Sequence, residues 1–476
     1  MYGSEPVQCE KIGLMLADIA ALDNTTDKQE NPARKEFSDL IRQYIHRDFS
    51  LSHMIDNGIA FHYGNLPSFV RKGIQELLSS SDLSFVVCTS TLLQGINLPA
   101  KNVFVMKPTK GRSDGIGVPI SSTEFWNLVG RAGRLTKDFE GNIFLINIDQ
   151  WQENPFSGPK RQTIYPSFRA HLCDRTSELL DFISNKDHGS GVQQNAGFEN
   201  SFMKLFNDYR SGKLSKTLEQ HQNFISSEMS VQITALMNEI SSGIDVPSEI
   251  TESNPNISVY RQQEMFNYIL SKMESDGPDV LIPPHPLQGS RDVYTMYLRL
   301  FKRIHNCFEK KATSDKSHTY FASLALSWMR GKSYAELLNK RIQQKQKTLK
   351  RGHPDVNTEA RALFREVEND LRFRYVKYTR CYIELLKHAL NEKGLNALID
   401  RIPPIYLFLE LGASSMTMMS LIGLGISRTG AAIVSDFAPK SDMKREDAVK
   451  WLKATNLNVM KLPNLLRNEL DAIVNQ

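Results

Sequence analysis

Short apolar runs alternate with helical patterns over residues 1–150, and this alternation limits the fold more than any other feature of the chain. The predicted strands are 58–62, 83–88, 102–106 and 141–147, and the predicted helices are 6–22, 33–49, 67–78 and 122–133. Strands that are joined through helices form parallel sheets, because each crossover needs a long connection. The sequence therefore predicts an α/β domain with a parallel sheet at residues 1–150.

One stretch of this region, EFWNLVGRAGR at 124–134, places two arginines directly after glycines on a predicted helix. A spacing of three puts Arg131 and Arg134 on one face, about one turn apart. A guanidinium pair of this kind suits a triphosphate, where charge builds on the transferring group. The alternative is an ordinary helix with two surface arginines.

Two upstream stretches carry related signals. The apolar run 83–87 leads into CTSTLLQGINLPA at 88–100, where hydroxyl residues at a helix start offer donors to an anion. The stretch GIAFHYGNLP at 58–67 is typical of a strand, a turn and a helix with Pro67 near its first turn.

In this order, the three stretches resemble motifs IV, V and VI of superfamily two helicases. The nearest branch is the superkiller-type group, whose last motif ends in GRAGR, as residues 130–134 do. The resemblance covers residues 1 to 150 well and the remainder only in patches. It implies the RecA-like fold and identifies residues 1–150 as the second RecA-like domain of a nucleic-acid-dependent ATPase.

The resemblance also implies roles for single residues. Arg131 and Arg134 would be arginine fingers that reach an ATP held mainly by a first RecA-like domain. The further residues implied on the nucleotide side are Gly95, Asn97, Asn127 and Gly130, with Asn127 standing where the family usually has Gln. The residues implied at the nucleic acid are Thr89, Ser90 and Thr91 on the backbone and His62 near the track.

Elements that would hold the nucleotide itself are absent from the sequence. It contains neither Gly-x-x-x-x-Gly-Lys-Ser/Thr nor an Asp-Glu dipeptide, so no group cradles the β- and γ-phosphates or fixes Mg²⁺. Residues 1–5 also leave no room for a first strand and loop. We therefore expect ATP and Mg²⁺ to be held mainly by a first RecA-like domain, on another chain or upstream, and the chain to be inactive alone. No metal site is expected within it.

The stretch KPTKGRSDGIG at 107–117 has two interpretations. It is polar and rich in glycine, which is typical of a flexible connector. In the superkiller-type branch, a β-hairpin near this position can wedge between the strands of a duplex. The sequence leaves both interpretations open.

The rest of the 476 residues allows one or two further domains. We expect a linker at 151–200 with a helix at 170–185, a helical region at 201–335, and a basic helical domain at 336–476. Further helices are expected at 200–210, 215–242, 258–275, 291–312, 318–330 and 358–390. The five cysteines show no Cys-x-x-Cys spacing and no signal peptide is visible, which favours a reducing, cytoplasmic location. The apolar segment 406–426 is broken by Gly412-Ala413-Ser414-Ser415, so two short buried helices are expected rather than a membrane span.

Positive charge is concentrated at residues 340–387, where thirteen lysines and arginines face six acidic residues. The local net charge of +7 exceeds the +5 of the whole chain. An apolar stripe from Leu363 to Leu386 predicts a helix that packs one face inward. Off this stripe, Arg372, Lys377 and Arg380 are candidates for contacts with single-stranded nucleic acid. The alternative is a solvated charged face.

The stretch LIGLGISRTGAAI at 421–433 is similar to the helix–hairpin–helix element of some superkiller-type helicases. There, amides of a glycine turn meet a phosphate at a helix N-terminus. Gly425, Ser427 and Arg428 are the candidate residues, and a plain helix connection is the alternative.

Two functions follow from these patterns. The first is the C-terminal half of an ATP-dependent helicase or translocase that acts on a single strand of DNA or RNA. The second is a non-catalytic nucleic-acid binder derived from such a helicase.

Overall fold

The computed structural model describes residues 1–22, 31–89, 100–113, 116–130, 132–133, 140–161, 163, 165–185, 196–289, 292–310, 314–349 and 351–474. The chain forms two compact units. The first contains residues 1–162, 331–368 and 415–476, and the second contains residues 163–330 and 369–414. This division differs from the predicted boundaries at 200 and 335, because the segments 331–368 and 415–476 pack with N-terminal residues.

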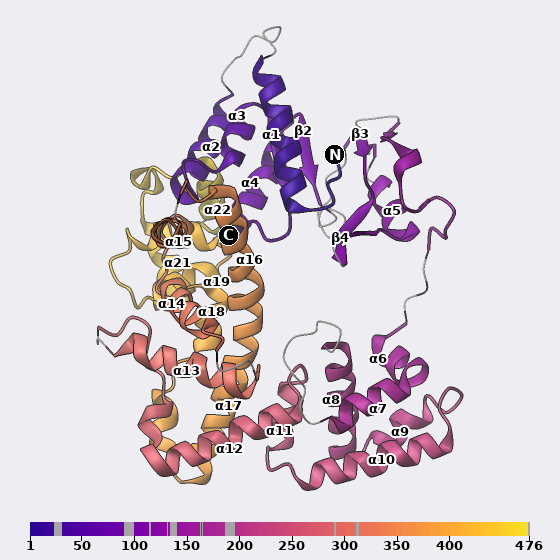
Figure 1. Ribbon diagram of the computed structural model, residues 1–476. Coiled ribbons are helices and arrows are strands. Elements are labelled where there is room, and N and C mark those ends of the chain that lie inside the picture. The colour runs from indigo at the N-terminus through magenta and orange to yellow at the C-terminus, as the bar shows by residue number, and fades with distance from the viewer. Residues whose placement is uncertain are drawn as a thin grey trace. The chain divides into compact units, whose positions relative to one another are not determined.

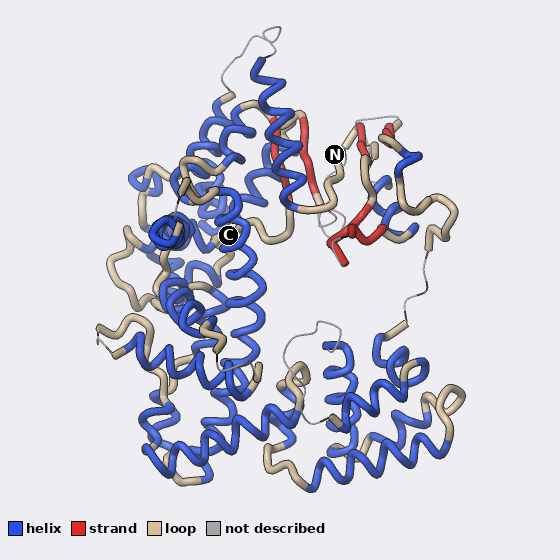
Figure 2. The backbone as a smooth tube through the Cα atoms, in the orientation of Figure 1, coloured by secondary structure: helices blue, strands red, loops and turns tan. Residues whose placement is uncertain are grey.

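The first unit is built on short parallel strands, shown in red in Figure 2. Strand β1 (Ile59–His62) pairs with β2 (Phe85–Cys88), and β3 (Asn102–Val105) pairs with β6 (Asn142–Leu145). All four strands lie within the predicted ranges, and both pairs are parallel. The expectation of a parallel α/β domain is confirmed.

The first three residues connect the two strand pairs. Tyr2 forms parallel bridges with both Cys88 of β2 and Val105 of β3. Its N–H donates to the Phe104 carbonyl at 2.9 Å, and the N–H of Gly3 donates to the Cys88 carbonyl at 2.7 Å. Met1–Gly3 therefore pair on both sides through isolated bridges, although no strand is described before α1.

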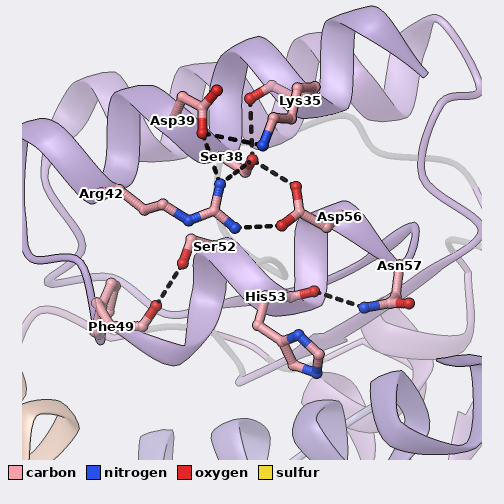
Figure 3. Close-up of polar contacts among 9 residues, drawn as sticks. All are labelled: Lys35, Ser38, Asp39, Arg42, Phe49, Ser52, His53, Asp56 and Asn57. Atoms are coloured by element: carbon pink, nitrogen blue, oxygen red, sulfur yellow. Dashed lines mark hydrogen bonds and ion pairs between the residues drawn. The ribbon is translucent and has the colours of Figure 1, made fainter. Parts of the chain in front are cut away.

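Helices α1 (Pro6–Leu22), α3 (Ser50–Asp56) and α4 (Ser68–Ser79) pack around β1 and β2 (Figure 1). The single helix predicted at 33–49 is two helices, since α2 (Pro32–Tyr44) ends before α3 begins. The apolar spacing continues through the buried Ile45 and Phe49, which hides the break in the sequence. Arg42 of α2 pairs with Asp56 of α3, fixing the two helices together (Figure 3).

The predicted helix at 122–133 is shorter than expected. Helix α5 (Ser122–Val129) starts at a capping box formed by Ser121 and Glu124 and ends at Gly130.

Just before α5, β4 (Thr109–Ser113) and β5 (Ile116–Pro119) form an antiparallel hairpin. A β-hairpin therefore occurs in this region, whereas its role as a wedge between the strands of a duplex stays a prediction.

Helices of the first unit that lie outside residues 1–162 are α15 (Tyr334–Thr348), α16 (Val356–Arg365), α19 (Met416–Gly423), α20 (Arg428–Ser435), α21 (Arg445–Ala454), the 3₁₀ turn Leu457–Met460 and α22 (Asn464–Val474). A short 3₁₀ helix, Ile148–Gln150, follows β6. Phe364 of α16 packs edge-on against Phe49, with ring centroids 5.9 Å apart. This contact ties the 331–368 segment to the N-terminal residues.

The second unit is helical. Its elements are α6 (Ser167–Arg169), a π-helical turn (Ala170–Asp174), α7 (Thr176–Ser184), α8 (Ala196–Arg210), α9 (Leu214–Glu219), α10 (Ser227–Ser242), α11 (Ser248–Ser253), α12 (Val259–Asp276), 3₁₀ Pro278–Leu281, α13 (Val293–Cys307), α14 (Ser317–Met329), α17 (Val376–Glu392), 3₁₀ Asn396–Arg401 and α18 (Ile405–Leu411). Leu172, Leu179 and Ile183 belong to a buried cluster with α8, so the predicted linker at 151–200 contains packed helix.

The predicted helix at 358–390 is continuous in the chain but not uniformly α-helical. A π-helical segment, Glu366–Tyr375, lies between α16 and α17. The predicted apolar stripe is buried at Leu363, Val367, Leu371 and Tyr375, as expected. Among the helices that the structure describes, none alone is long and apolar enough to cross a membrane, although the broken pair Asn396–Leu411 and Met416–Gly423 passes on length and composition when taken together.

Candidate nucleotide and nucleic-acid interface

Six of the predicted site residues lie outside the described residues: Arg131, Arg134, Ser90, Thr91, Gly95 and Asn97. Their roles stay predictions. The structure does describe the backbone on either side of them, and that backbone positions the two stretches to which they belong.

The residues between the two predicted arginine fingers are anchored next to Ala100, the last residue of the 88–100 stretch. Ala132 forms a parallel bridge with Ala100, and the Gly133 N–H donates to the Ala100 carbonyl at 2.8 Å. Gly133 has φ of +92°, which favours glycine, and a Cβ on Gly141 would lie 2.3 Å from the Ala132 carbonyl carbon. The glycines thus allow three backbone segments to meet where the predicted motifs V and VI end.

The remaining predicted nucleotide residues, Asn127 and Gly130, are exposed at the end of α5. At the other end of this helix, Lys110 of the hairpin donates to Glu124 at 2.5 Å. The helix is therefore held at its start, and near its end Asn127 and Gly130 are exposed while Leu128 and Val129 are buried. The nucleotide contacts of Asn127 and Gly130 stay predictions.

His62 and Thr89 are brought together at the ends of β1 and β2. The Thr89 N–H donates to the His62 carbonyl at 3.2 Å, as expected for parallel strands that end at one edge. Both side chains are buried, and His62 is only 2% exposed. Burial lowers the pKa of His62 to about 4, with the charge of Arg71 adding to the effect. Neither imidazole nitrogen has a hydrogen-bond partner among the described residues.

The buried imidazole makes the stability of the first unit sensitive to acid. Because the folded-state pKa of about 4 lies below the ordinary 6.5, the unfolded chain binds the proton first as the pH falls. Lowering the pH from 6.5 to 4 should reduce the free energy of unfolding by up to about 3 kcal/mol through this group. Urea unfolding of the wild type and of His62→Asn at several pH values measures the difference. Equal pH dependence of the free energy of unfolding in both proteins would contradict His62 as the source of this acid sensitivity.

The predicted phosphate contacts on the basic helix all have internal partners. The Arg372 Nε donates to the Glu410 carbonyl at 3.0 Å, and the Lys377 Nζ donates to the Asn256 carbonyl at 3.1 Å. Burial also lowers the pKa of Lys377. Arg380 pairs with Glu384 at 2.9 Å, one helical turn away. Of the three, Arg380 is the most exposed.

Much of the wider basic stretch is also neutralised within the protein. Arg341 pairs with Glu359 at 2.7 Å and with Glu366 at 2.6 Å. Arg361 pairs with Glu10 of α1. Burial of the Glu10 carboxyl raises its pKa to about 7, although the positive charge of Arg361 acts in the opposite direction. Glu359 and Glu366 are already counted in the local net charge of +7, whereas Glu10 lies outside 340–387, so it is the Arg361 pair that makes this value overstate the positive charge available to a nucleic acid.

The helix–hairpin–helix candidate forms the predicted turn between α19 and α20. Gly425 has φ of +101°, and no described atom lies within 4 Å of the position a Cβ would take. Ser427 caps α20 through Gly430, while its own N–H donates to the Glu469 carboxylate at 2.9 Å. The Glu469 side chain, 3% exposed, also accepts from Lys72 at 3.2 Å. A carboxylate of the protein thus lies where the resemblance expects a phosphate.

Arg428, the third candidate here, uses its Nη2 to donate to the Lys332 carbonyl at 2.8 Å. No local pattern points to Glu469, which follows Ser427 by 42 residues. Its role becomes visible only once α22 packs beside α20.

The contacts of Ser427 lead to a prediction. Ser427→Ala removes the N-cap of α20 and should lower the free energy of unfolding by about 1 kcal/mol. Affinity for single-stranded DNA should change less than about threefold, because the backbone N–H of Ser427 already donates to the Glu469 carboxylate. Chemical unfolding and fluorescence anisotropy measure the two effects. A large loss of affinity with unchanged stability would instead support a direct phosphate contact.

No cluster of three or more histidine, cysteine or acidic side chains that could hold a metal ion occurs in the described parts of the chain. All five cysteines are free thiols.

Comparison with known proteins gives partial matches. No family model matches the chain. It is 27% identical over 217 residues to the ATP-dependent DNA helicase Hel308 of Methanocella arvoryzae, covering 42% of this chain and 28% of that protein. It is 36% identical over 139 residues to Hel308 of Thermoplasma acidophilum, covering 29% and 19%. A third relative is Hachiman protein HamB of Bacillus cereus, 34% identical over 107 residues, covering 22% and 9%.

The chain spans less than a third of the length of each of these relatives. The shared segments and the small parallel sheets agree with a partial helicase fold followed by helices. The chain is therefore a helicase-related protein, similar over part of its length to superfamily two DNA helicases of the Hel308 type.

Proposed function

We propose that the chain is the second RecA-like half of an ATP-dependent DNA helicase or translocase. Arg131 and Arg134 would act as arginine fingers on an ATP that a nucleotide-binding half outside these 476 residues holds with Mg²⁺. DNA is preferred over RNA because relatives bear the name of DNA helicases.

The observation that carries this proposal is the hydrogen bond from Gly133 to Ala100. It fixes the backbone between Arg131 and Arg134 beside the end of the stretch that contains Gly95 and Asn97. In the proposed mechanism, closure of the two halves around ATP brings the guanidinium groups to the γ-phosphate, where they stabilise developing charge. Residues 90–91 hold the DNA backbone, so closure shifts the grip on one strand.

The hairpin β4–β5 supports strand separation as part of this function. Two contacts attach it to the domain. The Tyr2 hydroxyl donates to the Thr109 carbonyl at 2.8 Å, and Lys110 of β4 donates to Glu124 of α5. A hairpin held at its base can transmit movement of the domain to a duplex. Its neighbour α5 leads directly to the proposed fingers.

A second function keeps the DNA contacts without catalysis. The absence of a Gly-x-x-x-x-Gly-Lys-Ser/Thr motif from the sequence favours it. The two functions differ in whether a nucleotide-binding half restores ATP hydrolysis.

Both functions predict salt-dependent binding. The affinity for single-stranded DNA should fall about tenfold between roughly 50 and 200 mM salt, since each phosphate contact releases counterions. The fall should be modest because many basic side chains of 340–387 already pair within the protein. Fluorescence anisotropy with labelled DNA and RNA measures it. An affinity that does not change with salt would contradict any phosphate-tracking surface.

A further inference from the structure

Helix α1 carries apolar side chains on two opposite faces. The inward face packs on β1, β2 and α3 and includes the small, buried residues Gly13 and Ala17. The outward face carries exposed apolar side chains at Val7, Leu14, Met15, Ile19 and Leu22. Ile19 is 57% exposed and Leu22 is 80% exposed. Single exposed apolar residues are ordinary on a protein surface, whereas a row of them marks an interaction surface.

These side chains form one stripe along the helix, the α1 stripe, which consists of positions 7, 11, 14, 15, 18, 19 and 22. At 3.6 residues per turn, all of them except position 19 fall within about a third of the helix circumference, and position 19 lies at the edge of this arc. Positions 11 and 18 hold Lys11 and Asp18, whose side chains are both exposed. The α1 stripe is thus apolar, with one positive and one negative charge two helical turns apart.

The apolar residues of the α1 stripe are spaced symmetrically about its centre. Leu14 and Met15 lie on either side of the midpoint, and Val7 and Leu22 lie equally far from it. A contact with twofold symmetry brings each residue of one copy against the residue at the mirrored position of the other copy. If two copies of α1 pack antiparallel about this midpoint, Val7 packs on Leu22 of the partner subunit. Leu14 packs on Met15 of the partner subunit in the same way, so apolar side chains meet apolar side chains.

The two charges of the α1 stripe follow the same symmetry with opposite sign. Lys11 and Asp18 are also equally far from the midpoint, so an antiparallel pair of helices places Lys11 against Asp18 of the partner subunit at both ends. A parallel pair would instead place like charges together, which is costly at an interface. Within the chain, the Asp18 carboxylate lies 3.4 Å from the Nε2 of His53, a contact between two exposed side chains that costs little to break. The charges therefore favour a second copy in the antiparallel direction.

We propose that the α1 stripe binds a second copy of this chain, in an antiparallel helix pair whose twofold axis passes between Leu14 and Met15. The apolar side chains supply the attraction, and the two ion pairs between Lys11 and Asp18 fix the direction and the register. Because one helix from each copy forms the contact, the interface is small, and we expect a Kd of about 10–100 μM. This association needs neither the nucleotide-binding half nor DNA, so it stands apart from the proposed function.

Sedimentation velocity of the full chain tests the interface. Over concentrations that bracket the expected Kd, the sedimentation coefficient should rise from that of a monomer toward that of a dimer. Met15→Glu places a carboxylate against the apolar Leu14 of the partner subunit and should weaken association about tenfold or more. Val459→Glu is the matched control, because Val459 is 70% exposed and lies outside α1, and it should leave association unchanged. A monomer at every concentration, or equal effects of the two variants, would overturn the proposal.

Exchanging the two charges tests the antiparallel register. Lys11→Glu opposes two carboxylates and Asp18→Lys opposes two ammonium groups, so each substitution alone should weaken association about tenfold. In the combined variant the reversed charges face each other again, and the Kd should return to within about threefold of the wild-type value. Single variants that associate as the wild type does, or a combined variant that stays as weak as the single ones, would overturn the proposal. Urea unfolding of each variant checks that these exposed substitutions leave the fold intact.

Discussion

Arg131→Ala should lower the rate of ATP hydrolysis by about 10³-fold when the chain is combined with the nucleotide-binding half. The alanine removes a guanidinium that meets the charge developing on the transferred phosphoryl group. Since this contact forms mainly in the transition state, kcat should fall far more than the KM for ATP changes. Steady-state hydrolysis with saturating single-stranded DNA measures both constants.

Two control variants separate this effect from a general loss of charge. Arg47→Ala removes an arginine whose side chain is 84% exposed, and it should leave turnover unchanged. Arg131→Lys keeps the charge but not the planar fork, and it should restore only part of the rate. Normal turnover of Arg131→Ala would reject the arginine-finger assignment.

Tyr2→Ala should lower the free energy of unfolding of the first unit by about 3–5 kcal/mol, the range for removing a large buried aromatic side chain. Tyr2 is 2% exposed and packs in one cluster with Val105, Phe125 and Leu128. Its hydroxyl also anchors the hairpin through Thr109. The substitution therefore removes the side chain that connects the sheet, α5 and the hairpin.

Urea unfolding followed by tryptophan fluorescence measures this loss, because Trp126 and Trp151 pack against the same cluster. Tyr2→Phe keeps the ring and should cost about 1 kcal/mol, the contribution of one hydrogen bond. If Tyr2→Ala cost no more than Tyr2→Phe, the central position of Met1–Gly3 in the sheet would be wrong.

The strands could be predicted because each lies in a short, mostly apolar run of the sequence. Ile59–His62 is buried at every position, and a continuous apolar run is the expected pattern for such a strand. The hairpin could not be predicted with the same means. Lys110 and Arg112 give β4 no apolar alternation, and its position depends on the distant Tyr2 hydroxyl.

The candidate site was predictable in its motifs but not in its electrostatics. Counting charges over 340–387 includes only acids that are near in sequence. Arg361 is paired with Glu10 and Arg374 with Glu309, both far away along the chain. In the same way, Glu469 takes the N–H of Ser427 across 42 residues. These partners depend on tertiary packing, which local patterns do not encode.

The most direct test of the account compares ATP hydrolysis by this chain, by the nucleotide-binding half, and by the two together, each with single-stranded DNA. The account predicts negligible hydrolysis by this chain alone and a DNA-stimulated rate only in the mixture, which Arg131→Ala abolishes. Full DNA-stimulated hydrolysis by the nucleotide-binding half alone, unchanged on addition of this chain, would contradict it.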